Sequence, residues 1–217
     1  MPASAKPYPP PNRRRQLMRW LSGLGLAPLA AALFRPGASH AALQPTPGDE
    51  LGPFYPLDWS GDIDADLVRL GSGDAAGGRL LELAGTVRDT AGRPLAGAVV
   101  EIWQADAAGR YRHPGVDPRT RDARFQGFGR TLTDAEGRYR FTTILPGNYG
   151  SRPPHIHFRV APPGGRELVT QMYFRGNNRE GNGYAPPERE ALSVDLTGSE
   201  EGGRVGFAAR FDLVLPA

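Results

Sequence analysis

The sequence predicts an all-β fold, a β-sandwich of mainly antiparallel strands connected by long functional loops. Several short segments alternate apolar and polar residues with a period of two, which is the pattern of half-buried strands. The 217 residues include 29 glycines and 22 prolines, which favour turns between short elements. No segment after residue 42 has helical periodicity. Short strands separated by turn residues in this way are typical of a sandwich or a barrel.

The strands are expected within residues 80–217, after an arm and loop at 42–79 that is rich in proline, glycine and aspartate. Leu81, Leu83 and Val87 follow the alternating pattern of a strand, and 89–92 supply a turn. The next strand, 98–103, is rich in β-branched and aromatic residues. Further strands are expected at 129–134, 138–143, 155–160, 168–174 and 205–215.

Residues 1–41 have the composition of an export signal that is removed from the mature protein. Six basic residues and no acid occur there, and an uncharged apolar run from Trp20 to Phe34 leads to small residues near Ala41. That run is shorter than the roughly 20 residues that span a bilayer. The arginines at 13–15 resemble a twin-arginine signal, with an ordinary secretory signal or a retained anchor as alternatives. We expect cleavage after Ala41 and a periplasmic or secreted protein.

The basic charge of the chain belongs to this leader. The whole sequence has 26 Lys and Arg against 23 Asp and Glu, a formal charge of +3, whereas the residues after 41 have 20 against 23. A mildly acidic domain gives no reason to expect a nucleic-acid partner. We also expect no stable membrane insertion once the signal has been removed.

The composition limits the chemistry that the chain can perform. There is no cysteine, which excludes disulfides, thiolate-held metals and a cysteine nucleophile. The only lysine is Lys6, which excludes a phosphate-binding loop of the GxxxxGK[ST] type. Histidine occurs only at positions 40, 113, 155 and 157. A metal in this protein would therefore be held chiefly by nitrogen and oxygen atoms.

A short repeat places two tyrosines in equivalent local sequences. Residues 106–112 read DAAGRYR and residues 134–140 read DAEGRYR. Tyr139 alternates with polar neighbours and is expected to pack in the core. Tyr111 is followed by a segment that breaks the strand pattern, which predicts a position near a loop mouth, where functional residues concentrate.

The strongest chemical signal is the segment RPPHIHF at 152–158. Residues at i and i+2 of a strand share one face, so His155 and His157 present two imidazoles together while Ile156 points the other way. Imidazoles in this arrangement suit a transition metal. A pair of surface or hydrogen-bonded histidines is the alternative.

These motifs together identify a resemblance. The chain resembles the intradiol ring-cleavage dioxygenases, the protocatechuate and catechol dioxygenase family, in an exported form and across most of residues 46–215. The segments that carry the resemblance are GPFYP at 52–56, IWQAD at 102–106 with GRYRH at 109–113, PGNY at 146–149, RPPHIHF at 152–158 and TQMYF at 170–174.

The resemblance implies a mononuclear non-haem ferric ion, Fe(3+), bound by Tyr111, Tyr149, His155 and His157. Tyr149 matches the ligand that dissociates when substrate binds. The implied reaction cleaves a catechol-type ring between its two hydroxylated carbons with O2 and gives a muconate-type diacid. The sandwich at 80–217 would be the catalytic unit. The resemblance is compatible with a homo-oligomer but does not determine the oligomeric state.

The resemblance also implies roles for residues beside the metal. Arg152 matches an arginine that stabilises negative charge on the ring, and Gln171 matches a glutamine that orients this arginine or the substrate. Gly52, Pro53 and Tyr55 are candidates for lining the substrate pocket, with a purely structural arm as the alternative. Gly150 and Ser151 stand where protocatechuate enzymes often have an aromatic residue, which predicts a more open pocket.

A second class of protein also fits part of the sequence. Residues 85–149 resemble prealbumin-like sandwich modules that bind carbohydrate or protein without catalysis. Such modules account for the strands and turns. They do not account for RPPHIHF or for the placement of Tyr111 and Tyr149.

Overall fold

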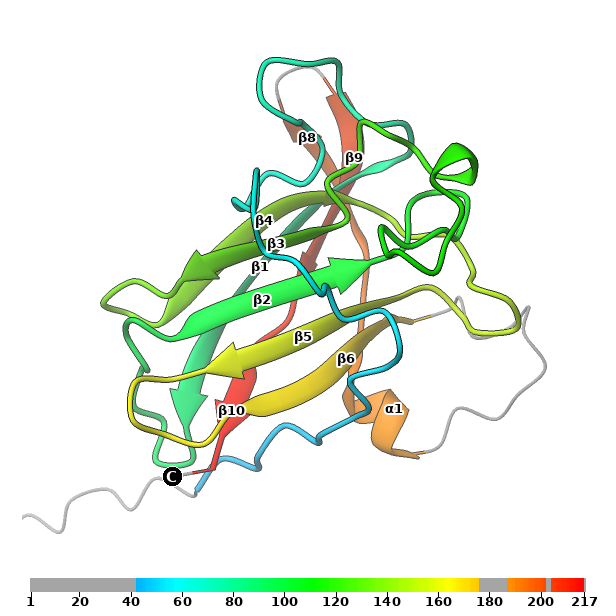
Figure 1. The fold of residues 1–217 in the computed structure, drawn as a ribbon. Coiled ribbons are helices and arrows are strands. Elements are labelled where there is room, and N and C mark those ends of the chain that lie inside the picture. The colour runs from blue at the N-terminus through cyan, green and yellow to red at the C-terminus, as the bar shows by residue number, and fades with distance from the viewer. Residues whose placement is uncertain (1–41, 176–186, 202–203, 217) are drawn as a thin grey trace, which may run out of the picture. The chain divides into compact units, whose positions relative to one another are not determined.

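The computed structural model describes residues 42–175, 187–201 and 204–216. The predicted export signal at 1–41 lies outside these residues. Within them, ten strands form two mixed, mostly antiparallel five-stranded sheets that pack as a sandwich (Figure 1). One sheet contains β1 (Leu80–Asp89), β4 (Arg138–Ile144), β8 (Thr197–Glu201), β9 (Arg204–Arg210) and β10 (Leu213–Leu215). The other contains β3 (Phe128–Leu132), β2 (Val99–Gln104), β5 (His155–Ala161), β6 (Leu168–Phe174) and β7 (Ser193–Val194), in that order.

The core lies between the two sheets and follows the alternation of the strands. β1 contributes Leu81 and Leu83, both fully buried, and β5 contributes Ile156 and Phe158 in the same way. Because side chains alternate across a strand, the neighbours of Ile156 point to the opposite face of its sheet. The two histidines of β5 therefore lie on the outer face of the β2–β5–β6 sheet, outside the sandwich core.

The arm at 42–79 covers that outer face and makes it a second buried region. In Figure 1 this arm, blue to cyan, crosses in front of β6, β5 and β2. The Asp49 amide donates to the Val169 carbonyl of β6 at 3.0 Å, and Thr170 Oγ1 donates to the Pro47 carbonyl at 2.8 Å. Trp103 of β2 anchors a second apolar cluster beneath the arm, separate from the sandwich core. Its other buried members are Ala105, Tyr111 and Phe128.

The predicted all-β sandwich is confirmed, with two corrections of detail. The segment at 205–215 is not one strand, because β9 pairs with the first half of β1 and β10 with the second half. Between them Asp212 accepts hydrogen bonds from the amide and hydroxyl of Thr86, both shorter than 3 Å. Four elements were not predicted: β7, β8, a short helix α1 (Pro187–Ala191) and the 3-10 turn Pro118–Thr120. β7, α1 and the 3-10 turn are too short to establish a period, and β8, with the sequence TGSEE, has no large apolar residue that could alternate with its polar ones.

None of the helices in the described part of the chain is long and apolar enough to cross a membrane.

Candidate functional site

Strand β5 brings two imidazoles together on the outer face of its sheet. His155 and His157 are only 3% and 2% exposed, and their ring centroids lie 4.8 Å apart. His157 is paired in register with Trp103 of β2, and the two rings stack at 4.9 Å with an interplanar angle of 10°. Indole packing and the sheet register therefore fix the orientation of His157.

Tyr111 joins the two histidines from a tight turn after β2. Asp106 closes this turn, because its Oδ1 accepts from the amides of Ala108 and Arg110 at 2.9 Å each. The turn delivers the Tyr111 hydroxyl to within 3.1 Å of His155 Nε2 and 3.2 Å of His157 Nε2. The Tyr111 ring is 3% exposed. Tyr111 thus meets two histidines that lie 44 and 46 positions away in the sequence, at one buried point.

Burial determines the charge of this cluster. It lowers the pKa of His155 to about 4 and that of His157 to about 2, with the neighbouring Arg152 acting in the same direction. Burial also raises the pKa of the Tyr111 phenol, against the opposing effect of Arg152. At neutral pH both imidazoles are consequently neutral and have lone pairs available to a metal.

The donor set fits a metal ion. The His155 Nδ1–H donates to the Pro153 carbonyl at 2.7 Å, which leaves Nε2 as the free ligand atom. The Tyr111 hydroxyl can donate its one proton to only one of the two Nε2 atoms that face it, and His157 Nδ1 is buried without a hydrogen-bond partner in the described part of the chain. Ligands bound cis at about 2.1 Å from a metal lie about 3 Å apart, which matches both contacts. No three His, Cys, Asp or Glu side chains group to hold a metal in the described residues, so the tyrosine is essential to any such site here.

Tyr149 lies next to this cluster but is more exposed. Its ring is 37% exposed and stands edge-on to Phe54 at 5.0 Å and to Tyr111 at 5.6 Å. The described contacts include no side-chain hydrogen bond from Tyr149 to Tyr111 or either histidine. A cavity of about 280 Å³ is lined by three aromatic residues, Phe54, Tyr111 and Tyr149, and by Gly109, Arg110, Gly115, Val116 and Thr120. We call this cavity the ring pocket.

Arg152 is fixed by a chain of hydrogen bonds that reaches the N-terminal arm. Its Nη2 donates to Gln171 Oε1 at 2.8 Å and to the Tyr173 hydroxyl at 3.1 Å. The Tyr173 hydroxyl lies 3.0 Å from Asp49 Oδ2, and Gln171 Nε2 donates to the Glu50 carbonyl at 2.7 Å. Burial, assisted by the negative charge of Asp49, raises the pKa of Tyr173 to about 12, so its proton stays in place to donate.

Sequence reasoning identified Arg152 and Gln171 but missed Asp49 and Tyr173. The signal for Tyr173 was present, because it follows Gln171 by two positions on the predicted strand 168–174 and so shares its face. The signal for Asp49 was absent, because its contact with Tyr173 joins residues 124 positions apart.

The three candidate pocket residues of the arm occupy different places. Gly52, at φ 75°, lies against His157, where a Cβ would come within 3.0 Å of Cε1. Pro53 is exposed. Tyr55 donates its hydroxyl to Glu101 at 2.9 Å and packs edge-on against Trp103 at 5.0 Å. Phe54, which lies between Pro53 and Tyr55 in the sequence, stacks on Tyr111 at 4.5 Å and lines the ring pocket.

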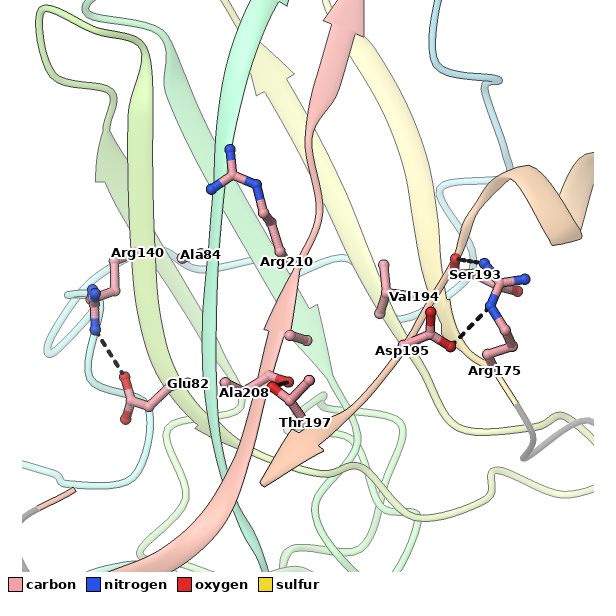
Figure 2. A pocket seen from close by; sticks show the side chains of 11 residues that line it. Glu82, Ala84, Arg140, Arg175, Ser193, Val194, Asp195, Thr197, Ala208 and Arg210 are labelled. Atoms are coloured by element: carbon pink, nitrogen blue, oxygen red, sulfur yellow. Dashed lines mark hydrogen bonds and ion pairs between the residues drawn. The ribbon is translucent and has the colours of Figure 1, made fainter. Parts of the chain in front are cut away.

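A larger cavity of about 840 Å³ lies elsewhere, over β1, β4 and β9 and beside β7 (Figure 2). Neither an imidazole nor a phenol lines it. Its three arginines each pair with an acid, as the dashed lines in Figure 2 mark for two of them. The pairs are Arg140 with Glu82 at 3.8 Å, Arg175 with Asp195 at 3.1 Å and Arg210 with Asp212 at 2.8 Å. Among the described residues, the cluster that fits a metal ion therefore lies beneath the arm and not in this larger cavity.

Known proteins are similar to this chain in sequence and in fold. The chain is 40% identical over 186 residues to the protocatechuate 3,4-dioxygenase beta chain of Burkholderia cepacia, covering 77% of each protein. It is 34% identical to a catechol 1,2-dioxygenase of Acinetobacter baylyi, spanning 74% of this chain but only 57% of that relative.

Solved structures agree with these relatives. The dioxygenase domain of a dioxygenase and carbohydrate-binding protein fusion from Streptomyces sp. SirexAA-E superposes with a TM-score of 0.61 at 31% identity, covering 80% of this chain and 99% of that one. Catechol 1,2-dioxygenase from Pseudomonas arvilla C-1 gives 0.63 at 31% identity, covering 79% and 62%. The family model described as Dioxygenase matches residues 51–217. With its sandwich fold and its buried Tyr111, His155 and His157, this chain belongs to the intradiol ring-cleavage dioxygenase family.

Proposed function

We propose that this protein is a non-haem ferric intradiol dioxygenase that cleaves a catechol-type ring between its hydroxylated carbons with O2. The observation that carries the proposal is the convergence of the Tyr111 hydroxyl on two imidazole Nε2 atoms at 3.1 and 3.2 Å in a buried site. Anionic phenolate oxygens favour a trivalent ion. When bound, Fe(3+) would supply the Lewis acidity that activates a chelated catechol toward O2.

Tyr111, His155 and His157 are the permanent ligands in this proposal. All three are held by the sheet or by the closed turn at 106–111, so they keep their positions when substrate enters. Stacking of Phe54 on Tyr111 and of Trp103 on His157 restricts both rings further. Rigid, buried ligands of this kind are what a preorganised metal site requires.

Tyr149 is the proposed fourth ligand and the one that leaves. Its greater exposure and its position on the wall of the ring pocket give it room to swing out. On departure, its phenolate oxygen would accept one of the two protons that a catechol loses on chelation, and a hydroxide bound at the site would accept the other. The two anionic oxygens of the catecholate would then replace the phenolate and the hydroxide, so the charge of the site would be unchanged.

Arg152 supplies positive charge at the reacting ring. Its guanidinium is held by Gln171 and Tyr173 and needs no reorganisation when negative charge develops on the substrate. Preorganised donors of this kind contribute about 3 kcal/mol or more to transition-state stabilisation in other enzymes.

The direct test measures metal and reaction together. Purified protein should contain one iron per chain and be red-brown from phenolate-to-iron charge transfer. Addition of catechol should consume O2 and release a ring-opened diacid that contains both atoms of the consumed O2. Cleavage outside the diol would contradict the intradiol assignment.

The alternative, a non-catalytic prealbumin-like binding module, makes the opposite prediction. Such a protein would be colourless and would stay free of iron after reconstitution. It also leaves the clustering of Tyr111 with two buried imidazoles without a role.

We further propose export through the twin-arginine route to the periplasm or the medium, from the basic leader at 1–41. N-terminal sequencing of protein recovered outside the cytoplasm tests this. An intact N-terminus there would contradict cleavage after Ala41.

A further inference from the structure

A second cavity adjoins the ring pocket. It is a groove of about 540 Å³, lined by both apolar and basic side chains, and we call it the side groove. Its lining includes Leu57, Arg112, His113, Val116, Arg121 and Phe128. The function proposed above for Tyr111, Tyr149 and the histidines does not use any of these residues.

The ring pocket and the side groove have one lining residue in common, and side chains of the two cavities are in contact. Val116 lines both of them. Phe54 of the ring pocket stacks on Tyr111 at 4.5 Å and contacts His113 of the side groove edge-on at 5.5 Å. A substituent that extends from a bound ring past Val116 would therefore enter the side groove.

The side groove contains two arginines that form no ion pair. Among the described residues, neither Arg112 nor Arg121 has an ion-pair partner. Arg112 donates a long 3.3 Å hydrogen bond to the Gln126 carbonyl, and its guanidinium carbon lies 5.7 Å from the centre of the Phe128 ring. Two guanidinium groups that line one groove without an ion pair provide a site for an anion.

The acids nearby form hydrogen bonds or ion pairs with groups other than Arg112 and Arg121. Asp62, whose charge acts on Arg112, accepts from the Gly71 amide at 2.9 Å. Asp58, which also lines the side groove, accepts from the Ser60 amide at 2.8 Å and the Ser60 hydroxyl at 2.9 Å. Asp117, on the segment that forms one wall, pairs with Arg119 at 2.8 Å. Arg112 and Arg121 are thus left for an external partner.

We propose that the side groove binds the anionic end of the substrate, so that the enzyme prefers catechols that have a carboxylate on a short aliphatic arm. This inference rests on the proposed function. The apolar walls at Leu57, Val116 and Phe128 suit the methylenes of the arm, and the guanidinium groups suit the carboxylate. A ring pocket of about 280 Å³ holds one aromatic ring, so the arm has to extend beyond it.

Anaerobic calorimetric titration tests this without turnover. The probes are 3-(3,4-dihydroxyphenyl)propanoate and its neutral counterpart 4-propylcatechol, bound to the iron-loaded protein. We expect tighter binding of the carboxylate at low salt and loss of this preference at high salt. Arg112→Gln and Arg121→Gln should each raise the Kd of the carboxylate about fivefold and leave that of the neutral probe unchanged.

Arg119→Gln is the matched control, since Arg119 lies on the same segment but is paired with Asp117. It should change neither Kd. Equal affinity for the two probes, no binding of either, or equal effects of all three substitutions would overturn the side-groove assignment. Oxygen uptake with unsubstituted catechol judges the proposed function separately: a protein that cleaves catechol without preferring the carboxylate refutes the groove alone. One that binds the carboxylate preferentially but cleaves nothing refutes only the dioxygenase.

Discussion

The chain contains the same turn twice, and the two copies serve different ends. In the copy at 106–112, Asp106 Oδ1 accepts from the amides of Ala108 and Arg110 at 2.9 Å each. In the copy at 134–140, Asp134 Oδ1 accepts from the equivalent amides at 3.0 and 2.8 Å. The glycines have left-handed φ angles of 78° and 74°. Locally the two turns are the same structure.

The tyrosines that leave these turns have almost the same burial but different partners. Tyr111 is 3% exposed and Tyr139 is 4% exposed. Tyr139 points into the sandwich core and donates to the Phe211 carbonyl at 2.5 Å. Tyr111 points to the outer face and meets two imidazoles. Local sequence therefore determines the turn, and the sheet face that the tyrosine enters determines what it does.

Removing the two hydroxyls should separate these roles most strongly. Tyr111→Phe should lower the iron content and reduce the charge-transfer absorption to what Tyr149 alone supplies. It should also lower kcat at least about 100-fold, since loss of a residue that only supports a metal ligand already costs about 10–100-fold. Tyr139→Phe should retain iron and activity but lose about 1–3 kcal/mol of unfolding free energy, because the Phe211 carbonyl is left unpaired. Absorbance, iron analysis and denaturant titration measure both. A Tyr111→Phe protein with the colour and activity of wild type would contradict the assignment.

Alanine at the two turn glycines should destabilise both copies but affect function in only one. Left-handed φ disfavours alanine, and the added Cβ would overlap the Asn148 carbonyl from position 109 and lie 2.5 Å from the Val87 carbonyl at position 137. Strain and overlap together should cost at least about 2 kcal/mol in each variant. Asn148 precedes Tyr149, so Gly109→Ala should also lower kcat, whereas Gly137→Ala should not. Equal kcat values for the two folded variants would contradict the prediction that only the turn at 106–112 supports the functional site.

A third buried tyrosine, Tyr173, extends the comparison to a residue that acts by positioning Arg152. Tyr173→Phe removes the hydroxyl that links Arg152 to Asp49. We expect iron content and resting colour to be retained while kcat falls about tenfold, equivalent to about 1.4 kcal/mol. Asp49→Ala should match this loss and Asp49→Asn, which keeps an acceptor oxygen, should restore most of the activity. A purely structural role would instead lower thermal stability and iron content along with kcat.

The residues that sequence patterns identified and those they missed differ in the range of their interactions. Alternation on one strand sufficed to predict that His155 and His157 share a face, and that Tyr139 packs in the core, because both follow from local geometry. The hydrogen bond between Asp49 and Tyr173 depends on how the arm crosses β6. The split of 205–215 likewise depends on how β9 and β10 share β1. No local pattern encodes such long-range pairings.

The smallest expected effects come from the aspartates that close the two turns, Asp106 and Asp134. Replacing each by asparagine tests whether they contribute equally to stability. Asp106→Asn should lose about 1 kcal/mol, because Asp106 is buried and its second oxygen also accepts the Asp122 amide at 2.8 Å. Asp134→Asn should have a smaller, pH-dependent effect. The hydrogen bond from Arg138 holds the pKa of Asp134 below its ordinary 3.8.

A carboxyl group with a depressed pKa stabilises the folded state above that ordinary value and loses this contribution as the pH falls through its folded pKa. Wild type should therefore be more stable than Asp134→Asn at pH 7, and the difference in unfolding midpoint should shrink as the solution is acidified below about pH 4. Denaturant titrations of both proteins at several pH values measure this difference. If it instead grew toward acid, Asp134 would be held neutral rather than ionised, and the two turns would differ in their local chemistry as well as in the face that their tyrosines enter.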